Sequence, residues 1–357
     1  MEHLILVVNP GSTSTKIAVY EGRKQIFLKK IRHLQEILQQ FDMIADQFEF
    51  RKNTIDDELS KAGINIKNIS IVVGRGGLLK PIAGGVYKVN DAMIHDIYHP
   101  MGEHESNLGG LIAYELAKEI NRKVMAIIVD PTCVDEMEDI ARISGMPELP
   151  RKSFLHALNQ RAVARMYARD IGKKYEEINV IVAHMGGGLS VGAHRKGRII
   201  DVNNGLNGEG PMSPERSGGL PVGQLVELCF SNKFSKAEIL RKIKGKGGLT
   251  AYLGTSDALE IEKRIEQGDE YAKLIYNAMS YQVAKEIGAL SAVLHGEVDG
   301  ILLTGGIAYG EMVTSFITEM VKHLGPVKVY PGEGEMEALA LNGYLVLSGE
   351  VEVKEYV

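Results

Sequence analysis

The sequence is poor in features that mark several other classes of protein. It has two cysteines, Cys133 and Cys229, which lie far apart and form no C-x-x-C pair, so we interpret both as buried thiols in a reducing compartment. No apolar run approaches the roughly 18 residues of a membrane span. The N-terminus starts directly on a strand-like run, without a basic signal segment. These absences predict a cytoplasmic protein with no membrane partner.

Positive charge is also scarce. The formal net charge is -5, whereas a nucleic-acid groove needs a basic surface, so we expect no nucleic-acid partner. One mild basic cluster, at residues 241–246 (RKIKGK), is typical of a solvated helix end.

Several catalytic motifs are missing as well. There is no G-x-x-x-x-G-K-[ST] loop, no H-E-x-x-H, no Ser-His-Asp order and no zinc-ligand spacing. No G-x-G-x-x-G follows the first strand, which argues against a dinucleotide-binding dehydrogenase. Three loosely spaced histidines, His95, His99 and His104, are better explained by a polar loop than by a metal site.

The most informative feature that is present occurs twice. Residues 4–20 (LILVVNPGSTSTKIAVY) and residues 179–193 (NVIVAHMGGGLSVGA) each combine an apolar strand, a polar residue, a turn rich in glycine, serine or threonine, and a second β-rich run. The copies start about 175 residues apart, which predicts two similar halves that each offer a phosphate loop to a cleft between them. This arrangement favours a nucleotide phosphotransferase.

Length and composition fit two domains. A chain of 357 residues with 45% apolar residues can bury two cores. Strands and helices alternate, as in α/β proteins, with helices expected at residues 33–48, 107–120, 153–175 and 271–294. A proline-bearing connector at residues 146–150 predicts a first domain at residues 1–150 and a second at residues 151–334. A final helix from residue 335 is expected to return to the first domain.

Residues 9–16 (NPGSTSTK) form the first candidate phosphate loop. Gly11 allows a tight turn that exposes backbone N–H groups. Ser12 and Ser14 add hydroxyl donors, and Lys16 adds a positive charge. Taken alone, the loop is explained equally well by an ordinary Ser/Thr hairpin.

The second candidate loop contains three consecutive glycines, Gly186, Gly187 and Gly188. Such a run costs chain entropy unless a ligand must approach the backbone, and a phosphate chain is the usual ligand. His184, just before it, is placed to donate to a γ-phosphate; the alternative is a histidine bonded only within the turn. A third candidate loop contains two adjacent glycines, Gly305 and Gly306, after a later strand. Adenosine can lie against the backbone there, although such glycine pairs are common.

Two arginines and two carboxylates complete the candidate set. Arg75 lies between glycines at a strand end and Arg216 lies in a glycine-rich loop, and the planar fork of arginine matches a carboxylate or a phosphate. Structural ion pairs are an equally open alternative for both. Asp130 ends a strand and Glu337 begins the last helix, where carboxylates can hold Mg²⁺ through water or act as turn and cap residues.

These residues resemble the acetokinase family, which comprises acetate, propionate and butyrate kinases. Residues 7–16 resemble its first signature, N-x-G-S-[ST]-[ST]-x-K, and residues 184–191 resemble its second, H-x-G-x-G-x-S-V. A strand-end Asp, R-S-G and T-G-G-I follow the family's order, so the resemblance spans nearly the whole chain. The short length and the N-P-G-S-T-S-T-K loop are most similar to the butyrate kinases.

The resemblance implies a fold and a set of partners. The fold is that of actin, sugar kinases and heat-shock ATPases, with two ribonuclease-H-like domains around a cleft. The implied cofactors are ATP/ADP and Mg²⁺, the implied substrate is a small carboxylic acid, and a homo-oligomer, at least a dimer, is expected.

Residue by residue, the resemblance implies roles for most of the candidates. His156 is the best match to a family histidine whose surrounding motif is absent here, so its role stays open. The other roles are Asn9, Ser12, Ser14 and Lys16 near the phosphates and metal, Arg75 and Arg216 on the substrate carboxylate and the transferring phosphoryl group, Asp130 near the substrate carboxyl and metal, His184 on the γ-phosphate, and Glu337 on Mg²⁺.

The implied reaction is a reversible in-line transfer of the ATP γ-phosphoryl group to butyrate or a branched analogue, giving an acyl phosphate and ADP. Acetate or propionate kinase activity, with a smaller pocket, is the nearest alternative. A nucleotide-driven switch or filament of the same superfamily is an alternative from another class.

Overall fold

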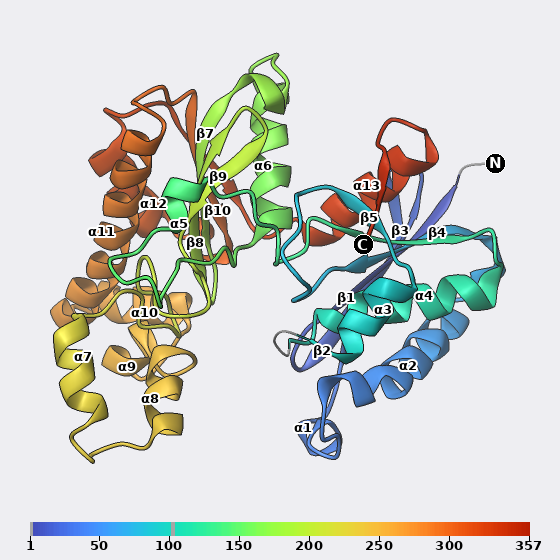
Figure 1. Cartoon of the computed structure of the whole chain (residues 1–357), viewed down its shortest axis with the longest axis horizontal. Helices are drawn as coiled ribbons and strands as arrows, with labels where there is room; N and C mark the ends of the chain where they lie inside the picture. The colour runs from blue at the N-terminus through green and yellow to red at the C-terminus, as the bar shows by residue number, and fades with distance from the viewer. Residues whose placement is uncertain (1–2, 101–103) are drawn as a thin grey trace. The chain divides into compact units, whose positions relative to one another are not determined.

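The structure is a computed structural model that describes residues 3–100 and 104–357. Its internal contacts divide the chain into two compact units. Unit 1 comprises Met1–Val134 and Gly334–Val357, and unit 2 comprises Asp135–Glu333. Figure 1 shows the strands and helices of each unit.

Unit 1 contains a seven-stranded sheet in the order β12-β5-β6-β4-β1-β2-β3. β1, β2 and β3 form an antiparallel meander, and β4 and β6 continue the sheet parallel to β1. The strands are β1 (Leu4–Pro10), β2 (Ser14–Glu21), β3 (Lys24–Arg32), β4 (Ile69–Arg75), β5 (Val86–Lys88), β6 (Met125–Val129) and β12 (Val353–Glu355).

Helices cover both faces of this sheet. On one face Leu6, Val8 and Val72 pack with residues of α4 in a buried cluster. On the other face α13 lies so close that a side chain at Gly343 would meet Ile5 and Val73. Burial on both faces explains why residues 4–8 of β1 and residues 71–73 of β4 are apolar. The helices are α1 (Gln35–Leu38), α2 (Phe48–Lys61), α3 (Asp91–Tyr98), α4 (Asn107–Ile120) and α13 (Glu335–Leu347), with short 3₁₀ turns η1 (Ile44–Gln47) and η2 (Ile66–Asn68).

Unit 2 contains a five-stranded sheet in the order β11-β10-β7-β8-β9. Its strands are β7 (Asn179–Met185), β8 (Leu189–Arg195), β9 (Arg198–Val202), β10 (Gly300–Gly305) and β11 (Val327–Pro331). Its helices are α5 (Asp139–Arg142), α6 (Ala157–Asp170), α7 (Val222–Cys229), α8 (Lys236–Ile243), α9 (Gly248–Leu253), α10 (Ala258–Glu266), α11 (Glu270–Val293) and α12 (Glu311–Val321), with 3₁₀ turns η3 (Tyr175–Glu177) and η4 (Gly306–Tyr309).

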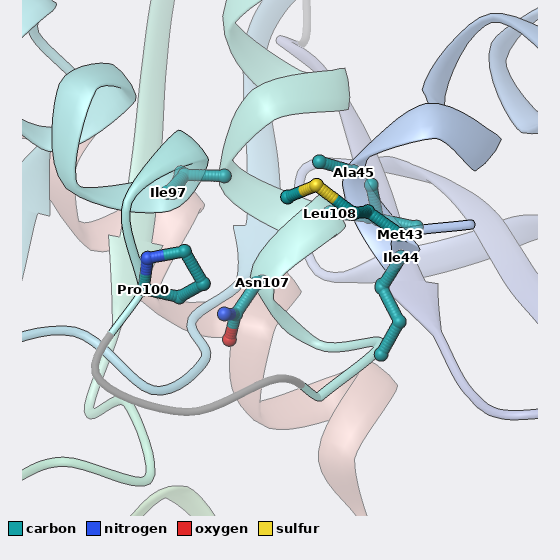
Figure 2. Close-up of a pocket in the computed structure, with 7 residues that line it drawn as sticks. All are labelled: Met43, Ile44, Ala45, Ile97, Pro100, Asn107 and Leu108. Atoms are coloured by element: carbon teal, nitrogen blue, oxygen red, sulfur yellow. The ribbon is translucent and has the colours of Figure 1, made fainter.

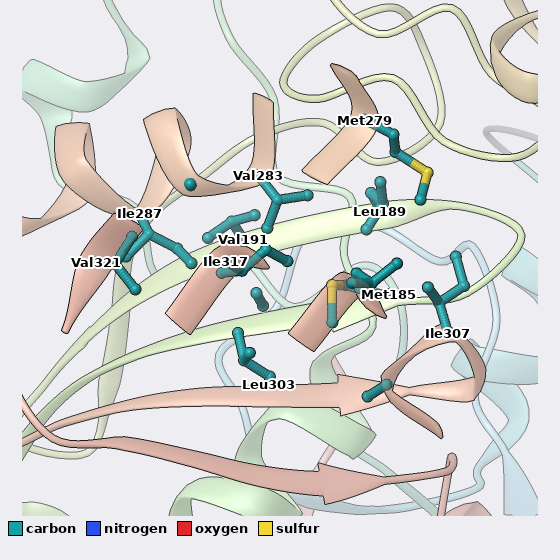
Figure 3. Close-up of a cluster of buried hydrophobic side chains, with 14 of the residues drawn as sticks. Met185, Leu189, Val191, Met279, Val283, Ile287, Leu303, Ile307, Ile317 and Val321 are labelled. Carbon is teal, nitrogen blue, oxygen red and sulfur yellow. The ribbon is translucent and has the colours of Figure 1, made fainter. Parts of the chain in front are cut away.

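The core of unit 2 lies between its sheet and two helices. Figure 3 shows Val191 and Leu303 of the sheet facing Val283 and Ile287 of α11 and Ile317 of α12. On the opposite face Val180 and Val182 pack against α6. Because alternate residues of β7 meet helices on both sides, its residues 180–183 are all apolar.

The two sheets repeat one topology. The order β3-β2-β1-β4-β6 in unit 1 recurs as β9-β8-β7-β10-β11 in unit 2, with the first three strands antiparallel and the last two parallel to the central one. Asn9 and His184 occupy equivalent places near the ends of β1 and β7. The structure thus bears out the duplication predicted from the two similar stretches.

Some local expectations were wrong. Residues 33–48 form only α1 and η1, and the long helix, α2, begins at Phe48. Its apolar face is narrow because only Ile55 and Leu59 are buried apolar residues on it, so periodicity did not reveal it. Cys133 is buried as expected, but Cys229 is exposed at the end of α7. No helix in the described part of the chain is long and apolar enough to cross a membrane.

The structure divides the chain earlier than residue 150. Residues 135–150 belong to unit 2 because their side chains and backbone pair within it. Glu136 forms an ion pair with Arg161 of α6 at 3.0 Å, and the Glu138 N–H donates to the carbonyl of Ile200 in β9. At the other end, α13 packs on β1 and β4.

Candidate active site

Unit 1 brings Asn9, Arg75 and Glu335 together. β1 and β4 are parallel neighbours with Val8 opposite Gly74, so Asn9 and Arg75 lie side by side at the strand ends. Glu335 is the first residue of α13. Its carboxylate accepts from Asn9 Nδ2 at 2.8 Å and from Arg75 Nη1 and Nη2 at 3.0 and 2.8 Å. Arg75 therefore holds a carboxylate in its fork, a two-point geometry that also suits phosphate.

The sequence pointed to Glu337, whereas the carboxylate that meets Asn9 is Glu335. Glu337 is exposed, and Glu335 is 8% exposed. The charge of Glu337 acts on Tyr20 instead. Burial, and to a smaller extent this charge, raise the pKa of the Tyr20 hydroxyl to about 12. Residues two apart on a helix point about 200° apart, so only one of the two glutamates can face the strand ends. Both belong to the first turn, and no sequence signal distinguishes them; no contact tests the metal role predicted for Glu337, and Glu335 is the alternative that the structure offers.

The first phosphate loop is shorter than expected. β1 ends at Pro10 and β2 begins at Ser14, so the turn between them comprises only residues 11–13. The Gly11 N–H donates to the Ser14 carbonyl at 2.7 Å and closes this turn, and Ser12 is exposed at its tip. Lys16 pairs with Asn9 across the hairpin, so both side chains lie on one face of the sheet.

Asp130 lies at the same edge of the sheet. Its neighbour Val129 pairs with Arg75 across β6 and β4. The Asp130 backbone has a φ of 38°, an uncommon left-handed value for a residue with a side chain, and Oδ1 accepts from the Gly85 N–H at 2.7 Å. Backbone strain of this kind gathers at functional sites. Its predicted role beside the substrate carboxyl stays a prediction.

In unit 2, His184 is oriented by Asn159 of α6. Asn159 Nδ2 donates to the Glu333 carbonyl at 2.5 Å, so its Oδ1 faces His184 Nδ1 at 2.7 Å. Nδ1 therefore carries the proton, and Nε2 faces the glycine turn, 3.2 Å from where a Cβ of Gly186 would stand. The His156 ring stacks on His184, with centroids 3.9 Å apart. Asn159 was not among the site residues predicted from the sequence, because α6 and β7 meet only in the fold.

His156 begins a chain of buried polar groups. His156 Nδ1 lies 2.9 Å from Ser190 Oγ, to which Gln160 Nε2 also donates at 2.9 Å. Gln160 Oε1 accepts from His194 Nε2, and His194 Nδ1 meets the Tyr175 hydroxyl at 2.8 Å. Burial, helped by two nearby arginines, lowers the pKa of His194 to about 3, so this histidine stays neutral at ordinary pH. The network fixes the ring that stacks on His184.

Arg216 packs against the triple-glycine turn. A Cβ at Gly188 would collide with the Arg216 guanidinium, whose Nη1 donates to the Gly205 carbonyl. Ser213 Oγ donates to the Gly187 carbonyl at 2.7 Å and accepts from the Arg216 N–H at 3.2 Å, so the loop and the turn form one assembly. Burial lowers the pKa of Arg216, and Glu215 opposes this effect. Glycine at position 188 thus leaves room for the guanidinium of Arg216 in this position, and a side chain there would displace it.

The glycines after β10 differ from one another. Gly305 has a φ of +92°, and a side chain there would meet the backbone of Met185, so close strand packing alone requires glycine. A Cβ at Gly306, by contrast, would face open space. Nucleotide contact at these positions stays a prediction.

A small hollow in unit 1 borders the segment that follows Arg75. It lies where η1, α3 and α4 meet, and Figure 2 shows its lining residues. Asn107, at its edge, accepts from the Leu78 N–H at 2.6 Å, and a side chain at Gly77 would collide with Asn107. The lining residues are Met43, Ile44, Ala45, Ile97, Pro100, Asn107 and Leu108.

The described residues contain no cluster of three or more histidine, cysteine, aspartate or glutamate side chains that could enclose a metal ion. His95 and His99 stack on each other at the end of α3, and His99 Nδ1 bonds the His95 carbonyl. The Glu335 carboxylate accepts from the Asn9 amide nitrogen, and Asn9 Oδ1 accepts from Arg75 Nη1 at 3.3 Å.

Comparison with known proteins decides the family. The profile of the acetokinase family matches residues 148–336. Butyrate kinase 2 of Clostridium acetobutylicum is 57% identical over 357 residues, 100% of both chains, and Butyrate kinase 1 of the same organism is 56% identical over 353 residues, 99% of both. The chain belongs to the acetokinase family.

The fold agrees with this assignment. The crystal structure of Porphyromonas gingivalis acetate kinase matches with a TM-score of 0.76 at 19% identity, covering 97% of this chain and 100% of the other. This acetokinase is therefore a duplicated α/β protein of the ribonuclease-H-like type, as the resemblance implied. Two groups of predicted residues are brought together, Asn9 with Arg75 in unit 1 and His184 with His156, Gly188 and Arg216 in unit 2.

Proposed function

We propose that this acetokinase is a butyrate kinase that transfers the γ-phosphoryl group of ATP to the carboxylate of butyrate or a branched short-chain acid. The observation that carries the proposal is the 57% identity, along the whole chain, to a protein named butyrate kinase. The forks of Arg75 and Arg216 and the oriented His184 support it, because the reaction must bring two anions into contact.

The chemistry asks little of the protein beyond positioning. A carboxylic acid with a pKa of about 4 to 5 is ionised at pH 7 and needs no general base to attack phosphorus. Catalysis then depends on alignment and on relief of charge repulsion. We assign Arg75 and Asp130 to the acid, Arg216 and His184 to the transferring group, and the glycine turn to the phosphate chain.

We propose Mg²⁺ as the accompanying cation. Asn9 Oδ1 and the Glu335 carboxylate are hard oxygen ligands of the kind that Mg²⁺ takes, directly or through water, and the hydrogen bond from Asn9 Nδ2 to Glu335 at 2.8 Å holds the two side chains together. When bound, the ion neutralises charge on the phosphates. The proposal also includes a cytoplasmic location and a homo-oligomer, the latter to be measured by light scattering of the purified protein.

A hydroxamate assay for acyl phosphate tests the proposal directly. Purified protein is supplied with ATP, Mg²⁺ and straight or branched acids of two to five carbons. We expect the highest kcat/KM with four or five carbons, because each methylene is worth about 1–3 kcal/mol of discrimination. A maximum at two or three carbons makes the protein an acetate or propionate kinase. ATP hydrolysis without any acyl phosphate favours a switch-like ATPase.

A further inference from the structure

A fully buried arginine lies behind the first phosphate loop. Arg51, in α2, has 0% of its surface exposed. Its Nη1 donates to the carbonyls of Gly11 and Ser14 at 2.8 and 3.3 Å, and its Nη2 donates to the Ser12 carbonyl at 3.2 Å. Gln47 Oε1 accepts from both Nε and Nη2 and fixes the plane of the guanidinium group.

Donors of unit 1 engage the backbone carbonyls of residues 11–14 in this loop. Arg51 takes the carbonyls of Gly11, Ser12 and Ser14, and the remaining one, that of Thr13, accepts from the His33 N–H at 2.9 Å. Four consecutive carbonyl oxygens are thus engaged by donors inside unit 1.

The direction of the carbonyls decides the direction of the amides. The peptide bonds here are trans, and in a planar trans peptide the N–H points opposite to the preceding C=O. With the Gly11 and Ser12 carbonyls facing Arg51, the N–H groups of Ser12 and Thr13 face away from it. Successive outward N–H groups form an anion-binding concavity, and inward carbonyls remove the dipoles that would repel an anion.

The charge of Arg51 adds to this effect. Among the described residues, all of its hydrogen bonds go to neutral acceptors, including Thr15 Oγ1 at 3.1 Å. Burial lowers its pKa, and the more distant Glu105 opposes that shift. A buried cation that is not paired with a carboxylate is costly, and an anion on the outer side of the loop offsets part of that cost.

We propose that Arg51 is a positioning residue that holds residues 11–15 in the form that binds the phosphate chain of ATP or ADP. The inference rests on the proposed function, since it deepens the phosphate site of that reaction. Arg51 touches the loop from behind and is not offered as a group that contacts the reacting atoms.

The test compares Arg51→Lys, Arg51→Met and Gln47→Leu with the unaltered protein. ADP affinity is measured by calorimetry, and KM for ATP and for the acid by the hydroxamate assay. We expect ADP binding to weaken by about tenfold or more in both Arg51 variants, with a parallel rise in KM for ATP and little change in KM for the acid. Lysine keeps the charge but cannot span three carbonyls. We therefore expect Arg51→Lys to bind ADP more tightly than Arg51→Met and less tightly than the unaltered protein.

Ile55→Val is the matched control, because Ile55 is buried one turn further along α2 and belongs to the apolar cluster of unit 1. Gln47→Leu keeps the test open if the Arg51 variants do not fold. Folded variants with unchanged ADP affinity overturn the inference, and so does an equal loss in Ile55→Val. Unaltered protein that binds ADP but makes no acyl phosphate defeats the proposed function alone, and the binding comparison still decides the role of Arg51.

Discussion

Glu335 and Arg75 form a two-point ion pair at the ends of α13 and β4. Nη1 and Nη2 of Arg75 lie 3.0 and 2.8 Å from the two carboxylate oxygens of Glu335. The pair couples a residue of the last helix to one more than 250 positions earlier in the chain. A substrate carboxylate or a phosphate that enters the fork of Arg75 must compete with Glu335 or share the arginine with it.

The two neighbouring glutamates give the first prediction. Glu335→Gln should lower kcat by about tenfold or more, because the uncharged amide neither balances Arg75 nor offers a carboxylate to Mg²⁺. Glu337→Gln, two residues away and exposed, should leave turnover nearly unchanged. Steady-state rates against Mg²⁺ concentration measure both variants, and a reversed ranking would restore Glu337 as the metal-binding carboxylate.

The second prediction concerns the space that Arg216 fills. Gly188→Ala should displace the guanidinium and reduce kcat as a milder form of Arg216→Ala, for which we expect a loss of about 10²-fold. Gly288→Ala is the control, since a Cβ there meets open space on α11. Near-normal turnover in Arg216→Ala would count heavily against the assignment of this arginine to the transferring phosphoryl group.

The third prediction tests how His184 is oriented. Asn159→Leu removes the acceptor that fixes the Nδ1 proton, so kcat should fall by about 10–100-fold, by analogy with the loss of a group that orients a metal-ligating histidine. Thermal melting of the same variant separates this effect from unfolding. Full activity in a folded Asn159→Leu protein would mean that the tautomer of His184 does not matter.

The fourth prediction is a pH dependence of stability that arises from His194. Its pKa is about 3 in the folded protein, against 6.5 for an ordinary histidine, so below pH 6.5 the unfolded chain binds a proton that the folded protein does not. The stability is therefore fully present above pH 6.5 and is lost as the pH falls towards 3, with a slope of up to about 1.4 kcal/mol per pH unit. Urea unfolding of the whole protein between about pH 4 and 7 measures how steeply the free energy of unfolding changes with pH.

His194→Gln keeps a polar group in the network and removes the titration, so its unfolding free energy should change less over the same pH range. His33 belongs to unit 1, and burial with Arg51 nearby lowers its pKa to about 4, so it contributes in the same direction. Equal slopes in the unaltered and His194→Gln proteins would show that other groups cause the acid sensitivity.

Much of the architecture could be predicted from local sequence patterns. The helix at residues 107–120 and the duplicated hairpins were predicted because apolar periodicity and glycine-rich turns depend only on residues close together in the sequence. α2 was missed because its buried face is only partly apolar: one of its buried residues, Arg51, is charged, and the carbonyls that it bonds lie 37 or more positions away.

The sequence by itself determined the family, the repeated α/β topology and the kinds of residue that handle phosphate, because strand patterns and signature loops are local. Only the tertiary structure decided that Glu335 rather than Glu337 meets Asn9, that Asn159 orients His184, and that Gly188 makes room for Arg216. Each of these pairings joins separate elements or picks one side of a helix, and the packing of helices on sheets, which burial of apolar surface drives, sets those distances.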